Sequence, residues 1–254
     1  MKKLLAVAGL AISFGVLCAF GQTPATGVKA APGAIPRTAG GKPDFAGYWN
    51  IPYVPNMALG KEDSVPYTEA GRAAYVNHDA KDDPTSNCWF PGVPRIMQSP
   101  YPSQWVQTPS HLVILFEYMH TFRSIPLDGR PHPDKMEPAF MGDSTGHWEG
   151  DTLVVDTVGL KGPPWTWLDT AGHQHSDRLH VIERIQRTPD NIAYEFTVDD
   201  PKMYSQPWTL QRTLSALKMT PGLPELLEYN CDENNLDVKH LISTKPALQV
   251  PPGR

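Results

Sequence analysis

Apolar and polar residues alternate along many short runs of the chain, and a period of two is typical of β-strands. In the run from residue 179 to 185, the apolar face carries a single acid, Glu183. In the run from residue 208 to 214, the apolar face carries Arg212. An unpaired charge in the interior costs several kcal/mol, so we expect both side chains to point inward and to have a partner.

These runs recur about every 8–12 residues with turn residues between them, as in antiparallel sandwiches and barrels. We see no alternation of strands and helices of the kind that builds a parallel sheet. One short helix is expected over residues 69–76, with Thr68 as its N-cap. The predicted strands are residues 44–50, 104–108, 111–119, 121–127, 142–148, 152–158, 176–187, 192–199, 208–217 and 226–231.

A long proline-rich loop separates the first two predicted strands. Residues 79–104 contain five prolines, which exclude a regular strand ladder across this stretch. A loop of this length is uncommon in a compact domain unless it has a function or is tied down. We therefore expect it to be held by Cys88, with its aromatic residues covering an opening in the fold.

The first residues have the pattern of a signal peptide. Lys2 and Lys3 precede an apolar stretch at residues 4–17, and Ala19-Phe20-Gly21 is a small-x-small cleavage site. This predicts a signal peptide at 1–21, a flexible tether at 22–43, one domain at 44–254, and a periplasmic or secreted protein. No later stretch approaches ~18 consecutive apolar residues, so we expect no integral membrane segment after cleavage.

Cysteine usage and charge narrow the possible partners. An exported chain with two remaining cysteines, Cys88 and Cys231, favours one disulfide; two separately buried thiols are the alternative.

The net charge of −5, without a basic stripe, argues against nucleic acid and anionic membranes as partners. A small molecule is the expected partner, and the sequence does not specify an oligomeric state.

Two resemblances add to this picture. Gly47-Tyr48-Trp49 on a first strand, with Arg212 on a late strand, resembles the lipocalin and wider calycin pattern. That resemblance implies an up-and-down barrel with an apolar cavity, in which the tryptophan closes one end and the arginine packs across it.

Residues 44–234 also resemble an uncharacterised family of secreted bacterial proteins, which implies no reaction. Its motifs are residues 91–95 (PGVPR), 127–133 (LDGRPHP), 141–144 (MGDS), 148–157 (WEGDTLVVDT) and 175–176 (HS).

The histidine-rich stretch near residue 175 raises the question of a metal. His173 and His175 are two residues apart, so on a strand both would lie on one face. The spacing to Glu183 does not match the cupin pattern, and no His-Glu-x-x-His motif is present. We predict no cofactor and no metal, with a divalent metal at His173 and His175 as the lesser alternative. If these histidines have no functional role, we expect a polar loop in which His173 is solvated and His175 is structural.

Several polar residues on predicted strands suit acid–base chemistry. We predict Glu183 as a general base, His175 as its partner acid and Arg123 as an anchor for an anionic group, supported by Asp143 and His120. The alternative is that Glu117–Arg123 and Glu183–Arg212 are structural ion pairs. Ser144 lacks a nucleophile-elbow context, which argues against covalent catalysis. The predicted ligand contacts are Glu117, Arg212, Trp148, Trp167 and Tyr101.

The sequence thus predicts an exported antiparallel barrel of about nine or ten strands, with one short helix and the long proline-rich loop. Our first hypothesis is an enzyme (lyase, isomerase, hydratase or hydrolase) acting by acid–base chemistry on a small apolar or aromatic molecule. The alternative is a calycin-type binding protein for a small hydrophobic ligand, and the third possibility is a structural envelope protein. Convergence of Glu183, His175 and Arg123 on one cavity would favour the enzyme.

Overall fold

The computed structural model of the protein describes residues 33–218 and 226–231, so the predicted signal peptide lies outside the described residues. Nine strands, one α-helix and five short 3₁₀ helices make up this part of the chain. The strands are β1 (Gly47–Asn50), β2 (Pro102–Gln107), β3 (His111–Phe116), β4 (Thr121–Pro126), β5 (Asp143–Glu149), β6 (Thr152–Val158), β7 (His180–Arg187), β8 (Asn191–Asp199) and β9 (Trp208–Ala216). The helices are η1 (Glu62–Ser64), α1 (Glu69–Asn77), η2 (Ala80–Asp82), η3 (Pro84–Asn87), η4 (Arg95–Gln98) and η5 (Tyr118–His120).

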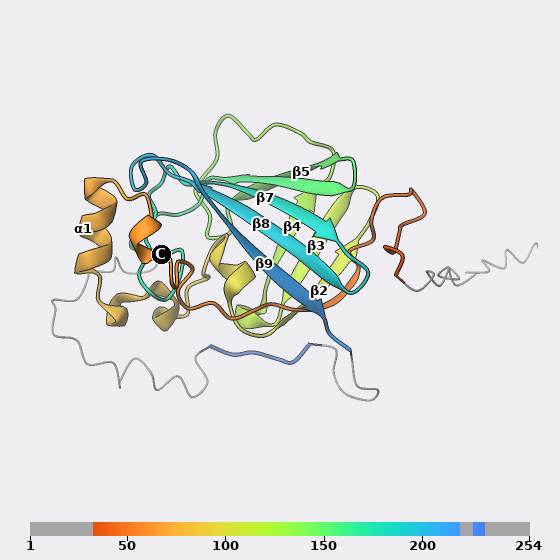
Figure 1. Ribbon diagram of the computed structural model, residues 1–254, viewed down its shortest axis with the longest axis horizontal. Helices are drawn as coiled ribbons and strands as arrows, with labels where there is room; N and C mark the ends of the chain where they lie inside the picture. Colours follow the sequence, from red (N-terminus) through yellow and green to blue (C-terminus); the bar gives the residue numbers. More distant parts are fainter. Residues whose placement is uncertain (1–32, 219–225, 232–254) are drawn as a thin grey trace, which may run out of the picture.

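The nine strands form one antiparallel sheet that curls into a nearly closed barrel. Their order is β4-β3-β2-β1-β9-β8-β7-β6-β5, and each strand is hydrogen-bonded to its neighbours in that order. In Figure 1, β7, β8 and β9 cross in front of β2, β3 and β4. The two edge strands, β4 and β5, contact each other without a hydrogen-bonded ladder, which leaves a seam. The predicted all-β antiparallel barrel is confirmed.

Alternation along the strands builds the core, as the pattern predicts. In β8, the side chains of Ile192, Tyr194, Phe196 and Val198 are buried inside the barrel, and the residues between them are more exposed. Burial of these apolar faces supplies the main stabilisation of the sheet. Glu183 on β7 lies on the inward face and is fully buried, in agreement with the period-two pattern.

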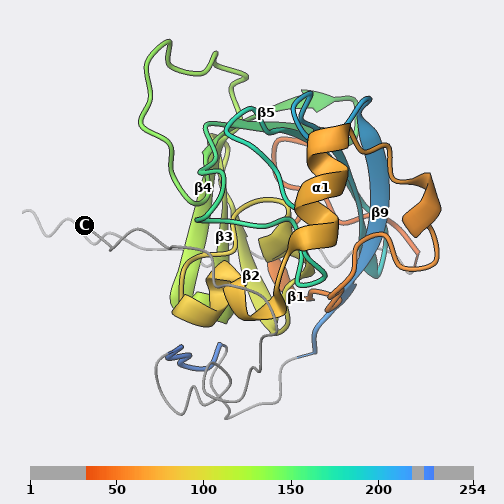
Figure 2. The same ribbon diagram turned by 90° about the vertical axis from the view of Figure 1, so that its left-hand side faces the viewer.

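Long connections gather at one end of the barrel, which we call the loop end. Strands β1, β3, β6 and β8 finish there, and residues 51–101, 117–120, 159–179 and 200–207 link them to the strands that come after them in the chain. Figure 2 faces this end and shows α1 lying in front of it. The predicted helix is confirmed, since the side chain of Thr68 accepts a hydrogen bond from the backbone N–H of Gly71.

The loop end is tied down by a disulfide. Cys88 and Cys231 are bonded, with their Cα atoms 5.6 Å apart, so the predicted pairing is confirmed. The strand predicted at residues 226–231 is wrong: this segment pairs with no described strand. It crosses the β3–β4 turn, where the N–H of Leu227 donates to Glu117 and the N–H of Tyr229 to His120. Side chains in the turn, not a strand edge, hold it in place.

The tryptophan of the Gly-x-Trp motif is buried, but the expected arginine does not cover it. Trp49 donates its Nε1–H to the carbonyl of Phe45. The guanidinium of Arg187, at the end of β7, lies 4.6 Å from the Trp49 ring centroid. Arg212 lies instead over Phe196 at 5.6 Å, because its place on β9 is nearer the loop end. The packing role assigned to Arg212 by the resemblance therefore belongs to Arg187.

The last part of the predicted tether is attached to the barrel. Arg37 forms a two-pronged ion pair with Asp151 in the β5–β6 turn, at 2.9 and 2.6 Å. Lys42 donates to the carbonyl of Gly150 and lies over the ring of Trp148. These contacts are mostly exposed, so each contributes little to stability.

Candidate functional site

The predicted base and the predicted anion anchor meet inside the barrel. Arg123 donates two hydrogen bonds to the carboxylate of Glu183, at 2.9 and 2.6 Å, and both side chains are buried. The hydroxyl of Tyr194 donates to the same carboxylate at 2.8 Å. Burial opposes the charge of Arg123, but the Glu183 carboxylate outweighs it and raises the pKa of Arg123. Burial also raises the pKa of Tyr194 well above its ordinary value, so its hydroxyl stays protonated.

This ion pair spans the seam of the barrel. Arg123 extends from β4 and donates to Ser144 on β5 at 3.1 Å, to Thr157 on β6 at 3.3 Å and to Glu183 on β7. It thus joins one edge strand to the three strands across the seam. The alternative pairs Glu117–Arg123 and Glu183–Arg212 are wrong, because the closed barrel places β4 beside β5 and directs Arg123 toward β7.

The other predicted catalytic residues lie elsewhere. His175 is buried between the hydroxyl of Thr166 and the carbonyl of Ser176, and burial lowers its pKa. Asp143 is part-exposed and contacts His132, and His120 accepts a hydrogen bond from the 226–231 segment. Glu183 and Arg123 therefore come together, whereas His175, Asp143 and His120 do not join them.

His173 is fully buried, not solvated, because Asp169 binds it. Nδ1 of His173 lies 2.6 Å from Oδ2 of Asp169, and its backbone N–H also bonds that carboxylate. The rings of Tyr67 and Tyr75 pack against its imidazole. His175, two residues on, contacts Thr166 instead, so the two histidines do not share a common partner.

Three of the five predicted ligand contacts are scattered over the barrel. Trp148 stacks on Phe45 at the end opposite the loops. Trp167 is buried beside His78. Glu117 is buried and accepts a hydrogen bond from the 226–231 segment. The barrel therefore does not gather these three side chains at one site.

A cavity of about 360 Å³ opens at the loop end, and we call it the mouth cavity. Its volume falls within the range of small-molecule sites, about 300–1,000 Å³. The proline-rich loop supplies most of its wall, but the aromatic residues of that loop, which we expected to cover an opening, are not among the residues that line it. It is lined by Tyr53, Val54, Ala80, Asp83, Thr85, Ser86, Arg95, Gln98, Ser99, Pro100, Tyr118, Asp169 and Thr170.

The remaining two predicted ligand contacts, Tyr101 and Arg212, each contact a side chain that lines the mouth cavity. The ring of Tyr101 stacks on that of Tyr118, with 6.1 Å between the centroids. Arg212 donates to the side-chain oxygen of Gln98, at 3.0 and 2.6 Å. Both residues thus support side chains that line the cavity and do not line it themselves.

A second buried ion pair forms one wall of the mouth cavity. Arg95 donates to both oxygens of Asp83, at 2.8 and 2.6 Å, and also to the hydroxyls of Thr85 and Thr170. Burial opposes the charge of Arg95, but Asp83 outweighs it and raises the pKa of Arg95. Burial raises the pKa of Tyr118, on the same wall, to about 12. The wall is therefore a fixed set of charged and hydroxyl groups.

Among the residues that line the mouth cavity, Gln98 has a buried side-chain donor without a hydrogen-bond partner in the described part of the chain. Arg212 holds the side-chain oxygen of Gln98, which fixes the amide so that Nε2 points away from the guanidinium. Nε2 is buried and has no hydrogen-bond partner among the described residues. A buried amide nitrogen without a partner costs about 1–3 kcal/mol.

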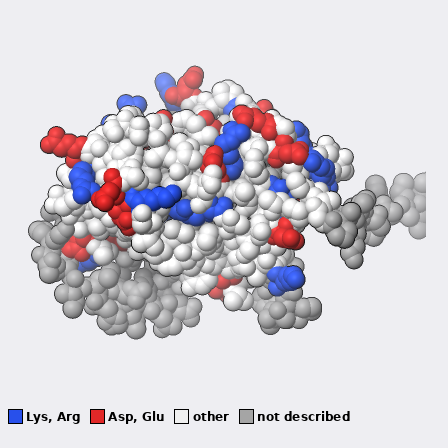
Figure 3. Space-filling model, viewed as in Figure 1, with Lys and Arg blue, Asp and Glu red and all other residues white. Residues whose placement is uncertain are grey.

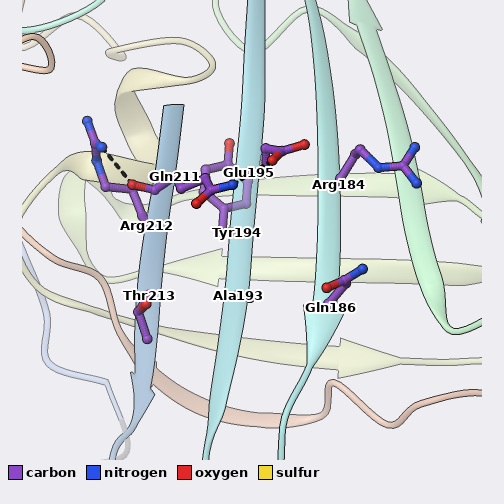
Figure 4. A pocket seen from close by; sticks show the side chains of 8 residues that line it. All are labelled: Arg184, Gln186, Ala193, Tyr194, Glu195, Gln211, Arg212 and Thr213. Atoms are coloured by element: carbon purple, nitrogen blue, oxygen red, sulfur yellow. Dashed lines mark hydrogen bonds between the residues drawn. The ribbon is translucent and has the colours of Figure 1, made fainter. Parts of the chain in front are cut away.

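A groove on the outside of the barrel is a different kind of surface. Side chains of β7, β8 and β9 border about 370 Å³ of space on the outer face (Figure 4). Several already bond to one another or to neighbours, as Glu195 does with Gln211 and Arg184 with Glu149. Figure 3 shows acidic and basic side chains intermixed over this side of the molecule. The groove has the character of a solvated polar face.

Four more titratable side chains meet on the outer face of β5, β6 and β7, and we call them the outer cluster. Nδ1 of His132 lies 2.6 Å from Oδ1 of Asp143. Oδ1 of Asp156 lies 3.2 Å from Nε2 of His132 and 2.7 Å from Nε2 of His180. Only Asp143 was among the predicted residues. The signal that could have found two of the others is their place in the LDGRPHP and WEGDTLVVDT motifs.

Comparison with known proteins gives no identity: no protein-family model matches the chain, and no curated protein is similar to it. No helix in the described part of the chain is long and apolar enough to cross a membrane.

Proposed function

We propose that this protein binds a small molecule in the mouth cavity, as a barrel-type binding protein. The observation that carries the proposal is a cavity of ligand size whose wall includes Gln98, with its side-chain oxygen held by Arg212 and its Nε2 without a hydrogen-bond partner in the described part of the chain. This supports the binding hypothesis over catalysis by Glu183, whose carboxylate is already engaged by Arg123 and Tyr194.

The lining indicates the class of ligand. Tyr53, Pro100 and Tyr118 offer flat apolar surface, which favours an aromatic or cyclic body. The donor of Gln98 calls for a carbonyl or carboxylate oxygen on that body. Arg95 is neutralised by Asp83, so the cavity does not require an anion. Aromatic amides and aromatic carboxylates fit this combination.

Thermal-shift and calorimetric titrations with benzamide, benzoate, phenylacetate and neutral sugars test the proposal. We expect at least one aromatic compound to raise the melting temperature, because a ligand that binds only the native state stabilises it. Ala80→Trp should fill the cavity from its exposed rim and abolish the shift. Ala73→Trp, at an exposed position on α1 away from the cavity, is the matched control.

Gln98→Glu tests the specific donor. The variant keeps an oxygen for Arg212 but removes both N–H groups, so binding of benzamide or benzoate should weaken at least about tenfold, as loss of one buried hydrogen bond implies. The proposal fails if no compound shifts the melting temperature, or if Ala80→Trp binds as well as the wild type.

A further inference from the structure

The outer cluster has a feature that ordinary surface ion pairs lack. Two imidazole nitrogens from separate segments, Nε2 of His132 and Nε2 of His180, are directed at the same oxygen of Asp156. His132 comes from the β4–β5 connection, and the other two residues come from β6 and β7. The side chains are between one-fifth and about one-third exposed, so solvent and ions can reach them.

One of the two separations in the cluster is close to that of a pair of metal ligands, and the other is shorter. Metal–nitrogen and metal–oxygen bonds of about 2.0–2.2 Å in a tetrahedral site place the ligand atoms roughly 3.3 Å apart. The distances from Oδ1 of Asp156 to the two nitrogens are 3.2 and 2.7 Å. Two imidazoles and one carboxylate are also a ligand set that zinc and other divalent transition metals accept.

Asp143 contacts the other ring nitrogen of His132. It lies 2.6 Å from Nδ1 of His132, so it can take the N–H of that atom and leave Nε2 as the lone-pair donor. Metal-binding histidines almost always donate their other ring N–H to a carboxylate or carbonyl in this way, and the partner fixes the tautomer and ring orientation. His132 is thus oriented by one carboxylate toward another.

We propose that the outer cluster binds a divalent transition metal through Nε2 of His132, Nε2 of His180 and the carboxylate of Asp156, with Asp143 as a positioning residue. Binding exchanges the hydrogen bonds within the cluster for bonds to the metal, and any proton on either Nε2 leaves to solvent. In the hydrogen-bonded form, no three such side chains among the described residues are spaced for an ion. The part-exposed His180 and Asp156 therefore have to turn as the metal enters.

Equilibrium titration tests the proposal on the mature chain, with its disulfide intact, without a histidine tag and after chelator treatment. We expect one Zn²⁺ per chain by calorimetry, and a visible Co²⁺ spectrum typical of nitrogen and oxygen ligands at low coordination number. His132→Asn, His180→Asn and Asp156→Asn should each lose the high-affinity site. Asp143→Asn should retain the site but weaken it about 10–100-fold, as expected for an orienting carboxylate.

His147→Asn is the matched control, because His147 lies on the outer face of β5 and faces Glu149 at 3.5 Å but is not part of the cluster. It should bind Zn²⁺ like the wild type. Circular dichroism and melting curves establish that each variant is folded. Absence of 1:1 binding in the wild type overturns the proposal, as does equal binding by folded His132→Asn and His180→Asn.

Discussion

Removing one member of the Arg123–Glu183 pair should destabilise the barrel strongly. Arg123→Met keeps the length and apolar stem of the side chain but leaves the Glu183 carboxylate buried, with Tyr194 and Thr157 as its remaining partners. Breaking a buried ion pair in this way costs about 3–5 kcal/mol. It also unties β4 from β5, β6 and β7 across the seam.

Urea unfolding monitored through tryptophan fluorescence measures this loss of unfolding free energy. The urea midpoint should fall without a large change in the slope m, because the surface exposed on unfolding stays similar. In thermal unfolding, 1 kcal/mol corresponds to about 2–4 °C for a domain of this size, so the melting temperature should fall by roughly 6–20 °C.

A double-mutant cycle separates the ion pair from its surroundings. Glu183→Gln leaves Arg123 without a counter-charge and should also cost several kcal/mol, whereas Arg123→Met combined with Glu183→Gln should cost much less than the sum. A coupling energy above about 2 kcal/mol supports the pair as the clamp of the seam. If each single variant costs less than about 1 kcal/mol and the two effects add, the clamp is refuted.

Other parts of the fold give three smaller predictions. Thr68→Ala removes the cap of α1 and should cost about 1 kcal/mol in chemical unfolding, with Thr68→Ser close to wild type; equal losses would contradict the cap. Replacing Cys88 and Cys231 with serine should cost about 2–5 kcal/mol, and reduction of the wild type should reproduce the loss. Burial lowers the pKa of His175 below its ordinary 6.5, so just below pH 6.5 the unfolded chain binds a proton at this residue and the native state does not. Stability should therefore fall as the pH drops below about 6.5, and less so in His175→Asn; identical pH profiles would contradict this.

Local patterns in the sequence determined much of the fold. Alternation in residues 179–185 predicted that Glu183 points inward, and the expectation of an exported chain with two remaining cysteines predicted their pairing. Thr68 ahead of a short apolar segment predicted a capped helix. These features depend on neighbours in the chain or on composition, so the sequence alone predicts them. The strand predicted at 226–231 failed because an extended segment needs a partner strand, which a local pattern does not supply.

The candidate sites depend on contacts between distant segments. Arg123 and Glu183 are 60 residues apart, and Gln98 and Arg212 are 114 apart. The sequence predicted Glu183 and Arg123 at one cavity as base and anchor, whereas the ion pair that it offered for Glu183, as the alternative, was with Arg212. The curvature that brings β4 to β5 assigns that role to Arg123.

The sequence by itself determined that this chain forms an antiparallel barrel with charges inside, a covalent tie on its long loop, and its chemistry-bearing motifs on or beside strands. Only the tertiary structure decided which charges neutralise each other, which amide nitrogen has no partner among the described residues, and which motif residues meet in the outer cluster. The physical reason is that side-chain direction is a local property of a strand. Partnership depends instead on register and closure of the whole sheet, which no single segment contains.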